Sequence, residues 1–318
     1  MYCHRCGSAV PERAAYCPSC GVLLTHAPVT RNEFAAQAEA RPKRRRRGKA
    51  LLAFGMFMLV FVFEALGYFV GDVCGFDPNV STYVGGAVGA VVGMLVLGWR
   101  DLVIPRANAL GESLCMGWWL LTSSTLFCAF EVGSMVASGE WYVADGWPLR
   151  VLGLLVMCLG IGVCEECMFR GLLFGGLLSC RRGTDADVRL MAVVSSVLFG
   201  LAHVEWWAMN YADPMAWAQA VLKVVQTGML GLFLAAVLVK TRNVTGCMLL
   251  HGFSDFLLLV SSVGFMDATP DVEYVTSGPD SAAVVIVYVV AIAMYVPLLI
   301  QAIRVFAKPC ASPFATKG

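Results

Sequence analysis

The sequence predicts an all-α polytopic membrane protein with about eight transmembrane helices. Hydrophobic residues make up 58% of the 318 residues, charged residues make up only 14%, and the mean hydropathy is +0.72. From about residue 50 onward, apolar stretches of the roughly 20 residues that a membrane span needs follow one another. This composition excludes a soluble domain over most of the chain. We expect a small cytosolic domain at 1–25, a polar and then polybasic linker at 26–50, a transmembrane domain at 51–306 and a cytosolic tail at 307–318.

The first part carries two Cys-x2-Cys pairs separated by ten residues. Four thiolates at this spacing can surround one zinc ion in the closed tetrahedral geometry of a structural site. Disulfide bonds are the competing interpretation, but paired Cys-x2-Cys elements in a cytosolic segment usually bind metal. The segment resembles the zinc ribbons at the N-termini of many bacterial proteins, which indicates a structural zinc ion and a bacterial origin. The predicted ligands are Cys3, Cys6, Cys17 and Cys20.

A basic run at residues 41–49 directly precedes the apolar segment that begins at Leu51. Such a run could bind nucleic acid. Its position beside a membrane span favours instead an anchor on the anionic cytoplasmic leaflet of the lipid bilayer. We therefore expect no nucleic-acid partner, and we expect the ribbon in the cytosol, where it could bind a protein partner.

Eight apolar segments follow, at about 50–70, 82–98, 108–137, 148–180, 188–204, 215–239, 244–265 and 282–304. Lys and Arg then sort to the loops of one side, as the positive-inside rule requires. The predicted cytosolic loops and tail contain Arg100, Arg106, Arg181, Arg182, Arg189, Lys240, Arg242, Arg304, Lys308 and Lys317. The predicted outer loops contain Asp72, Asp77, Glu140, Asp145, Glu205, Asp213, Asp267, Asp271, Glu273 and Asp280. We expect a multi-pass plasma-membrane protein with both termini in the cytosol.

The segment at 148–180 is longer than a span needs, so it tilts, extends into the cytosol or breaks near Gly171 or Gly175–Gly176. Counting along the segments puts Glu165 and His251 in the cytoplasmic half of the membrane. The same counting puts His203 near the outer end of its segment, so linear counting does not bring the three side chains to one depth.

Three pairs of side chains at i and i+4 stand out within these segments. They are Glu166 with Arg170, Phe199 with His203, and His251 with Asp255, and Glu165 precedes the first pair. Residues at this spacing share one helix face. Ionisable side chains are expensive in lipid and mark functional sites by default. Buried Glu–Arg pairs and histidines can also simply hold helices together, but three such sets together indicate a function.

In this order the three sets resemble the signature motifs of the CPBP family of intramembrane proteases, also called the CAAX protease and bacteriocin-processing or Abi family. The resemblance covers roughly residues 148–260 and implies an intramembrane endopeptidase that cuts membrane-anchored peptides or proteins near the cytoplasmic face. It also implies that the third motif faces the carbonyl oxygen of the substrate. We assign Phe199 to substrate contact.

Hydrolysis of a peptide bond requires a water, a base that activates it and donors that stabilise the oxyanion. We expect Glu165 to be the base, since a buried carboxylate is a stronger base than one in water. His203 would hold or polarise the water, and Glu166 would form an ion pair with Arg170. Members of the family that have asparagine at the last position differ from this chain, because an ionised Asp255 only accepts hydrogen bonds.

Two alternatives remain open from the residues. Glu165, His203, His251 and Asp255 could hold a catalytic zinc ion, although the resemblance favours a glutamic mechanism without a catalytic metal. The protein could also be a non-proteolytic membrane scaffold or a bacteriocin self-immunity protein, in which the zinc ribbon binds a partner. A transporter uses similar buried charges, but the two halves of the sequence show no repeat. Lys223 can snorkel or line a cavity and is assigned no role.

Overall fold

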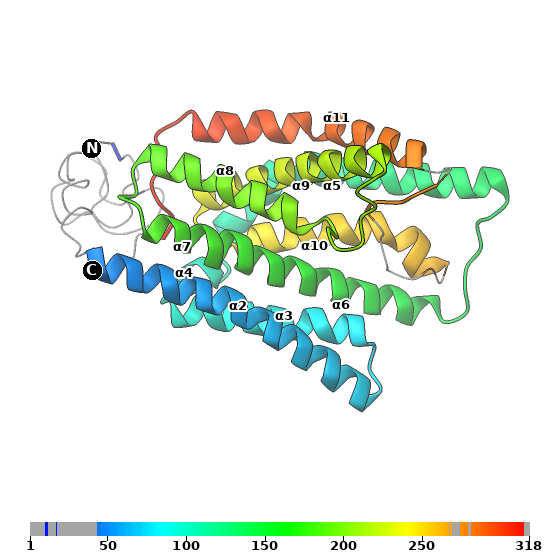
Figure 1. Ribbon diagram of the computed structural model, residues 1–318, viewed down its shortest axis with the longest axis horizontal. Helices are drawn as coiled ribbons and strands as arrows, with labels where there is room; N and C mark the ends of the chain where they lie inside the picture. The colour runs from blue at the N-terminus through cyan, green and yellow to red at the C-terminus, as the bar shows by residue number, and fades with distance from the viewer. Residues whose placement is uncertain are drawn as a thin grey trace.

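The computed structural model describes residues 10–11, 17, 43–266, 268, 274–278 and 281–314, and in this part of the chain all regular elements are helices (Figure 1). The α-helices are α2 (Lys43–Cys74), α3 (Pro78–Val96), α4 (Arg100–Val103), α5 (Ala107–Ser138), α6 (Trp147–Glu165), α7 (Phe174–Ser179), α8 (Asp185–Ala202), α9 (Pro214–Thr241), α10 (Thr245–Leu259) and α11 (Ser281–Phe306). Two π-helices, η1 (Glu166–Leu173) and η2 (Val260–Phe265), continue α6 and α10. The predicted all-α class is confirmed.

Seven helical stretches of the described residues are long and apolar enough to cross a membrane. They are Arg47–Cys74, Pro78–Val96, Ala107–Ser138, Trp147–Ser179, Pro214–Thr241, Thr245–Phe265 and Ser281–Phe306. The remaining predicted segment, 188–204, forms α8, which has 18 residues and begins with charged side chains. Its first turn is fixed by a capping box in which Thr184 and Asp187 exchange hydrogen bonds. The described helices therefore include seven candidate spans, the 18-residue α8 and the single turn of α4.

The long predicted segment at 148–180 is one continuous helical stretch of 33 residues that contains α6, η1 and α7. Neither Gly171 nor Gly175–Gly176 breaks it. The irregularity is instead the wide turn of η1, which begins at Glu166. Since α8 runs back along this stretch and ends at Ala202, it stops partway along α6, as Figure 1 shows. His203 therefore reaches the depth of Glu165 because α8 is short.

Glycines allow close approach of the helices around α6. A Cβ atom on Gly252 of α10 would lie 2.7 Å from the carbonyl oxygen of Cys158 in α6. A Cβ atom on Gly85 of α3 would lie 3.0 Å from the Cα atom of Gly67 in α2. Small residues at such crossings are typical of membrane helices, which associate by close packing. The contact at Gly252 fixes the helix that carries His251 against the helix that carries Glu165.

Basic residues gather where α3, α7, α9 and α11 end, and we call this the basic end of the bundle. Arg150 departs from the predicted sorting, because it lies in the first turn of α6 at the opposite end. Its Nε atom donates to the carbonyl oxygen of Asp145 at 3.3 Å. At the basic end, Arg242 donates to the carbonyl oxygens of Ser312 and Pro313 at 2.9 and 3.2 Å.

Candidate active site

The first predicted motif lies where α6 passes into η1. Glu166 Oε1 is 3.0 Å from Arg170 Nη1, and both side chains are buried, at 0% and 2% exposure. The guanidinium carbon of Arg170 lies 3.9 Å from the centre of the Phe199 ring, which supplies a cation–π contact from α8. π-Helical turns often occur at functional sites. Here the turn carries a buried ion pair directly after Glu165.

His251 of α10 joins this ion pair. Its Nδ1 atom is 2.9 Å from Glu166 Oε1, and its Nε2 atom is 3.4 Å from Asp255 Oδ2. An ionised carboxylate only accepts hydrogen bonds. With both carboxylates ionised, each ring nitrogen of His251 carries a proton, and the ring is an imidazolium cation between two anions.

His203 has a different environment at the C-terminal cap of α8. Its Nδ1 atom is 2.8 Å from the carbonyl oxygen of Phe199. A carbonyl oxygen only accepts, so Nδ1 donates and carries the ring proton. In the neutral ring Nε2 then presents a lone pair, and it lies 3.6 Å from Glu165 Oε2.

Glu165 lies between the two histidines. Its Oε2 atom is 3.6 Å from His203 Nε2 and 3.8 Å from His251 Nε2, and it has no hydrogen-bond partner among the described residues. Both separations exceed a direct hydrogen bond but suit a bridging water. The side chains of Glu165, His203 and Asp255 are 21%, 16% and 24% exposed, whereas His251 is only 3% exposed. These three side chains are therefore partly open to solvent, whereas the ion pair of Glu166 and Arg170 beside them is buried.

Phe199 is fully buried beneath the two imidazole rings. Its ring centre is 4.5 Å from that of His203 and 5.9 Å from that of His251, and the Phe169 ring packs at 4.9 Å. The structure thus gives Phe199 a packing role that holds both histidines. The predicted contact with substrate stays a prediction.

Three further side chains belong to this site although the sequence did not single them out. Tyr274, in the segment between η2 and α11, has its ring 6.3 Å from the His203 ring. Its carbonyl oxygen accepts from Tyr288 Oη at 2.7 Å. Gln219, fully buried in α9, donates to the carbonyl oxygen of Thr276 at 3.0 Å and accepts from its backbone N–H at 2.8 Å. In the sequence, a glutamine within an apolar span is the one signal of this attachment of the Thr276 backbone to α9.

Candidate metal ligands were predicted in two places. Cys3, Cys6 and Cys20 lie outside the described residues, while Cys17 is described and buried, so the zinc ribbon stays a prediction. Within the described ranges, no three or more His, Cys, Asp or Glu side chains are arranged so that they could hold a metal ion. His251 instead has a carboxylate beside each ring nitrogen, Glu166 Oε1 at 2.9 Å from Nδ1 and Asp255 Oδ2 at 3.4 Å from Nε2.

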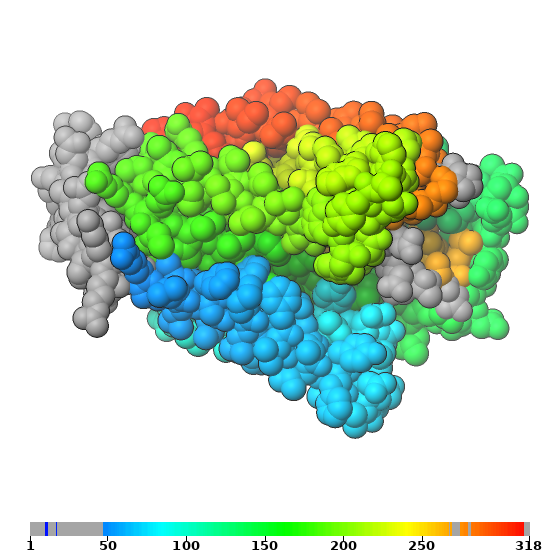
Figure 2. Space-filling model, viewed as in Figure 1, coloured from blue at the N-terminus to red at the C-terminus, as the bar shows by residue number. Residues whose placement is uncertain are grey.

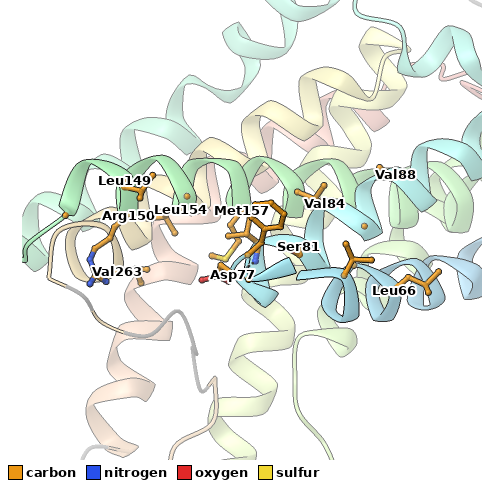
Figure 3. Close-up of a pocket in the computed structure, with 18 of the residues that line it drawn as sticks. Leu66, Asp77, Ser81, Val84, Val88, Leu149, Arg150, Leu154, Met157 and Val263 are labelled. Atoms are coloured by element: carbon orange, nitrogen blue, oxygen red, sulfur yellow. Dashed lines mark hydrogen bonds between the residues drawn. The ribbon is translucent and has the colours of Figure 1, made fainter. Parts of the chain in front are cut away.

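A separate pocket of about 1110 Å³ lies between the α2–α3 pair and the first half of α6. Figures 1 and 2 show α2 and α3 diverging from the rest of the bundle toward this end. Figure 3 shows Leu154 and Met157 of α6 beside Ser81 and Val84 of α3 in this pocket, whose lining is mainly apolar. None of the predicted catalytic residues lines it.

Comparison with known families agrees with this geometry. Residues 146–257 match the family model described as Type II CAAX prenyl endopeptidase Rce1-like. The predicted resemblance to the CPBP and CAAX protease family is confirmed over this segment, which contains every predicted catalytic residue. Searches of curated proteins and of solved structures found no match.

Proposed function

We propose that this chain, whose residues 146–257 carry an Rce1-like endopeptidase domain, hydrolyses peptide bonds of membrane-anchored peptides or proteins with a water activated by Glu165. The observation that supports this most strongly is the position of Glu165 Oε2, 3.6 and 3.8 Å from the Nε2 atoms of His203 and His251. One water between these groups would contact a base, an acceptor and a donor at once.

The first step is the attack of this water. The water donates one proton toward Glu165 and orients the other toward Nε2 of His203, which is an acceptor because Nδ1 donates to Phe199. As the water oxygen bonds to the carbonyl carbon, Glu165 takes the proton and the carbonyl oxygen becomes an oxyanion. Glu165 then returns that proton to the amide nitrogen as the C–N bond breaks, which yields an amine and a carboxylic acid. The acid keeps the second proton of the water and loses it to solvent as the product leaves.

His251 supplies the donor for the oxyanion. As an imidazolium whose Nε2 is 3.4 Å from Asp255 Oδ2, it can donate its Nε2–H to the developing negative charge without turning the ring, and charged donors stabilise an oxyanion strongly in a site shielded from water. Asp255 then acts as an acceptor that keeps His251 protonated. This role removes the need for a donating asparagine at position 255.

Glu166 and Arg170 hold His251 in place rather than react. Glu166 contacts His251 Nδ1 at 2.9 Å and Arg170 Nη1 at 3.0 Å through the same oxygen. Both side chains are too deeply buried to meet a substrate. They fix the orientation of the histidine ring and keep Nδ1 protonated, as outer partners of catalytic groups commonly do.

The test is mass spectrometry of membrane-anchored peptides incubated with the purified protein in nanodiscs. Wild type is compared with Glu165→Gln and with Glu112→Gln, a matched control because Glu112 is 42% exposed and pairs with Lys240. We expect products from wild type and from the control but none from Glu165→Gln. Cleavage that persists in Glu165→Gln contradicts the proposal.

A chelator arm separates the glutamic mechanism from a metal mechanism. Since a chelator also strips a zinc ribbon, it is applied to wild type and to Cys6→Ser. The glutamic mechanism predicts that Cys6→Ser cleaves equally well with and without chelator. Loss of cleavage on chelation in both proteins indicates a catalytic metal instead.

A scaffold or self-immunity protein is the second candidate function. It would bind its partner through the N-terminal ribbon and would not need Glu165. If Glu165→Gln retains full function in cells at unchanged abundance, the scaffold explains the protein better than the protease does.

A further inference from the structure

Lys223 is a charged side chain in the middle of a candidate span. It lies in α9, within Pro214–Thr241, and is only 9% exposed. Among the described residues, its ammonium group has no carboxylate within 4.0 Å. A buried cation in a membrane span is costly unless it pairs with other groups. The groups around the Lys223 ammonium therefore indicate which negative charge it balances.

Aromatic rings hold the ammonium group in place. Lys223 Nζ lies 3.8 Å from the centre of the Tyr274 ring and 6.0 Å from that of Tyr288. Tyr288 and Gln219 in turn fix the backbone of Tyr274 and Thr276. Because Gln219 and Lys223 are four residues apart, one face of α9 both anchors this segment and presents the ammonium group to it.

The same arrangement brings the ammonium group close to the candidate active site. The Tyr274 ring, which contacts Lys223 on one side, is 6.3 Å from the His203 ring. The ammonium group is therefore separated from His203 by the Tyr274 ring alone. Asp255 and Glu165 are the two carboxylates of the site whose charges favour the charged form of Lys223, Asp255 first.

The site has more carboxylates than cations when Lys223 is left out of the comparison. Glu166 has two positive partners, Arg170 at 3.0 Å and His251 at 2.9 Å. Asp255 and Glu165 have only the Nε2 side of His251 between them, at 3.4 and 3.8 Å. Two carboxylates that share one imidazolium in an apolar bundle repel each other. A second cation is needed to keep both of them charged.

We propose that Lys223 is a positioning residue of the catalytic site, in which its ammonium group, held on Tyr274, is the counter-ion of Asp255. Asp255 thereby remains an acceptor for His251 Nε2. This inference rests on the proposed proteolytic function and extends it to α9, which lies between the second and third motifs along the chain.

The test is a double-mutant cycle of Lys223→Met and Asp255→Asn. Lys223→Met should lower kcat about tenfold or more with little change in KM, because it leaves the charge of Asp255 uncompensated. In Lys223→Met/Asp255→Asn that charge is absent, so kcat should return to within about threefold of Asp255→Asn alone. Lys223→Arg should retain most of the activity. Lys240→Met is the control, because Lys240 is in the same helix but 45% exposed.

Two results overturn the proposal. If the losses from Lys223→Met and Asp255→Asn simply multiply in the double variant, the two charges are not coupled. If Lys223→Met raises KM and leaves kcat unchanged, Lys223 binds substrate instead. The same cycle is measured on thermal unfolding in detergent, where Asp255→Asn should again offset the effect of Lys223→Met. That readout does not need activity, so coupling in unfolding without cleavage by wild type refutes the protease and leaves the ion pairing intact.

Discussion

Replacing Arg170 by methionine should destabilise the protein far more than breaking an equally close ion pair at its surface. Arg170 and Glu166 are 3.0 Å apart and at most 2% exposed, and Arg170 also lies over the Phe199 ring at 3.9 Å. Removing one partner of a buried pair leaves the other charge uncompensated, which costs about 3–5 kcal/mol. The comparison is Lys240→Met, which breaks a 2.9 Å pair with Glu112 that is more than 40% exposed on both sides. Exposed pairs contribute about 0–1 kcal/mol.

The measurement is the free energy of unfolding in mixed micelles, from titration with SDS followed by tryptophan fluorescence. Arg170→Met/Glu166→Gln should recover part of the loss, because neither charge is then left alone. If Arg170→Met costs no more than Lys240→Met, the pair does not lie in a low-dielectric interior. If the double variant loses the sum of the two single losses, uncompensated charge is not the cause.

Three other predictions concern packing and reactivity. Gly252→Ala should cost about 1–3 kcal/mol in the same titration, since its Cβ atom would lie 2.7 Å from the Cys158 carbonyl oxygen. An equal loss in Gly153→Ala, where a Cβ atom meets nothing within 4 Å, would contradict this reason. Phe314→Ala should cost about 3 kcal/mol, because its ring is 7% exposed and packs 4.8 Å from that of Trp99; unchanged unfolding would show that the C-terminal segment adds no stability. Burial raises the pKa of the Cys310 thiol, so less of it is thiolate at pH 8 and it should react with iodoacetamide more slowly than exposed Cys180. Equal rates, followed by mass spectrometry, would contradict that expectation.

The helices and the meeting of the three motifs could be predicted from the sequence. Apolar length indicates the spans, and the i, i+4 spacing puts Glu166 with Arg170 and His251 with Asp255 on one helix face each. The observed contacts of 3.0 and 3.4 Å agree with that spacing. The convergence of these faces follows from the cost of leaving charged groups in lipid, which any fold of this chain must avoid.

The depth of His203 and the role of the Tyr274 segment could not be predicted in the same way. Linear counting treats each apolar segment as a full span, but α8 ends at Ala202, and its last turn includes the Phe199 carbonyl that orients His203. The wide turn of η1 was not predicted either, because π-helical turns are rare interruptions of α-helices and the apolar pattern of 148–180 indicates only a helix. Tyr274 reaches the site through tertiary hydrogen bonds from Gln219 and Tyr288, which local sequence does not encode.

The short length of α8 has a consequence for the bilayer itself. At 1.5 Å per residue, the stretch Trp147–Ser179 is about 50 Å long, whereas α8 is about 27 Å long and is followed by irregular chain up to Pro214. Irregular backbone that faces lipid cannot stay in hydrocarbon, because its N–H and C=O groups would lose their hydrogen bonds. Trp207 in that chain is 84% exposed, as an aromatic at a headgroup boundary is. The chain at 203–213 must therefore be covered by protein, headgroups or water rather than by lipid tails, so the bundle meets the bilayer differently on the side where His203 closes α8.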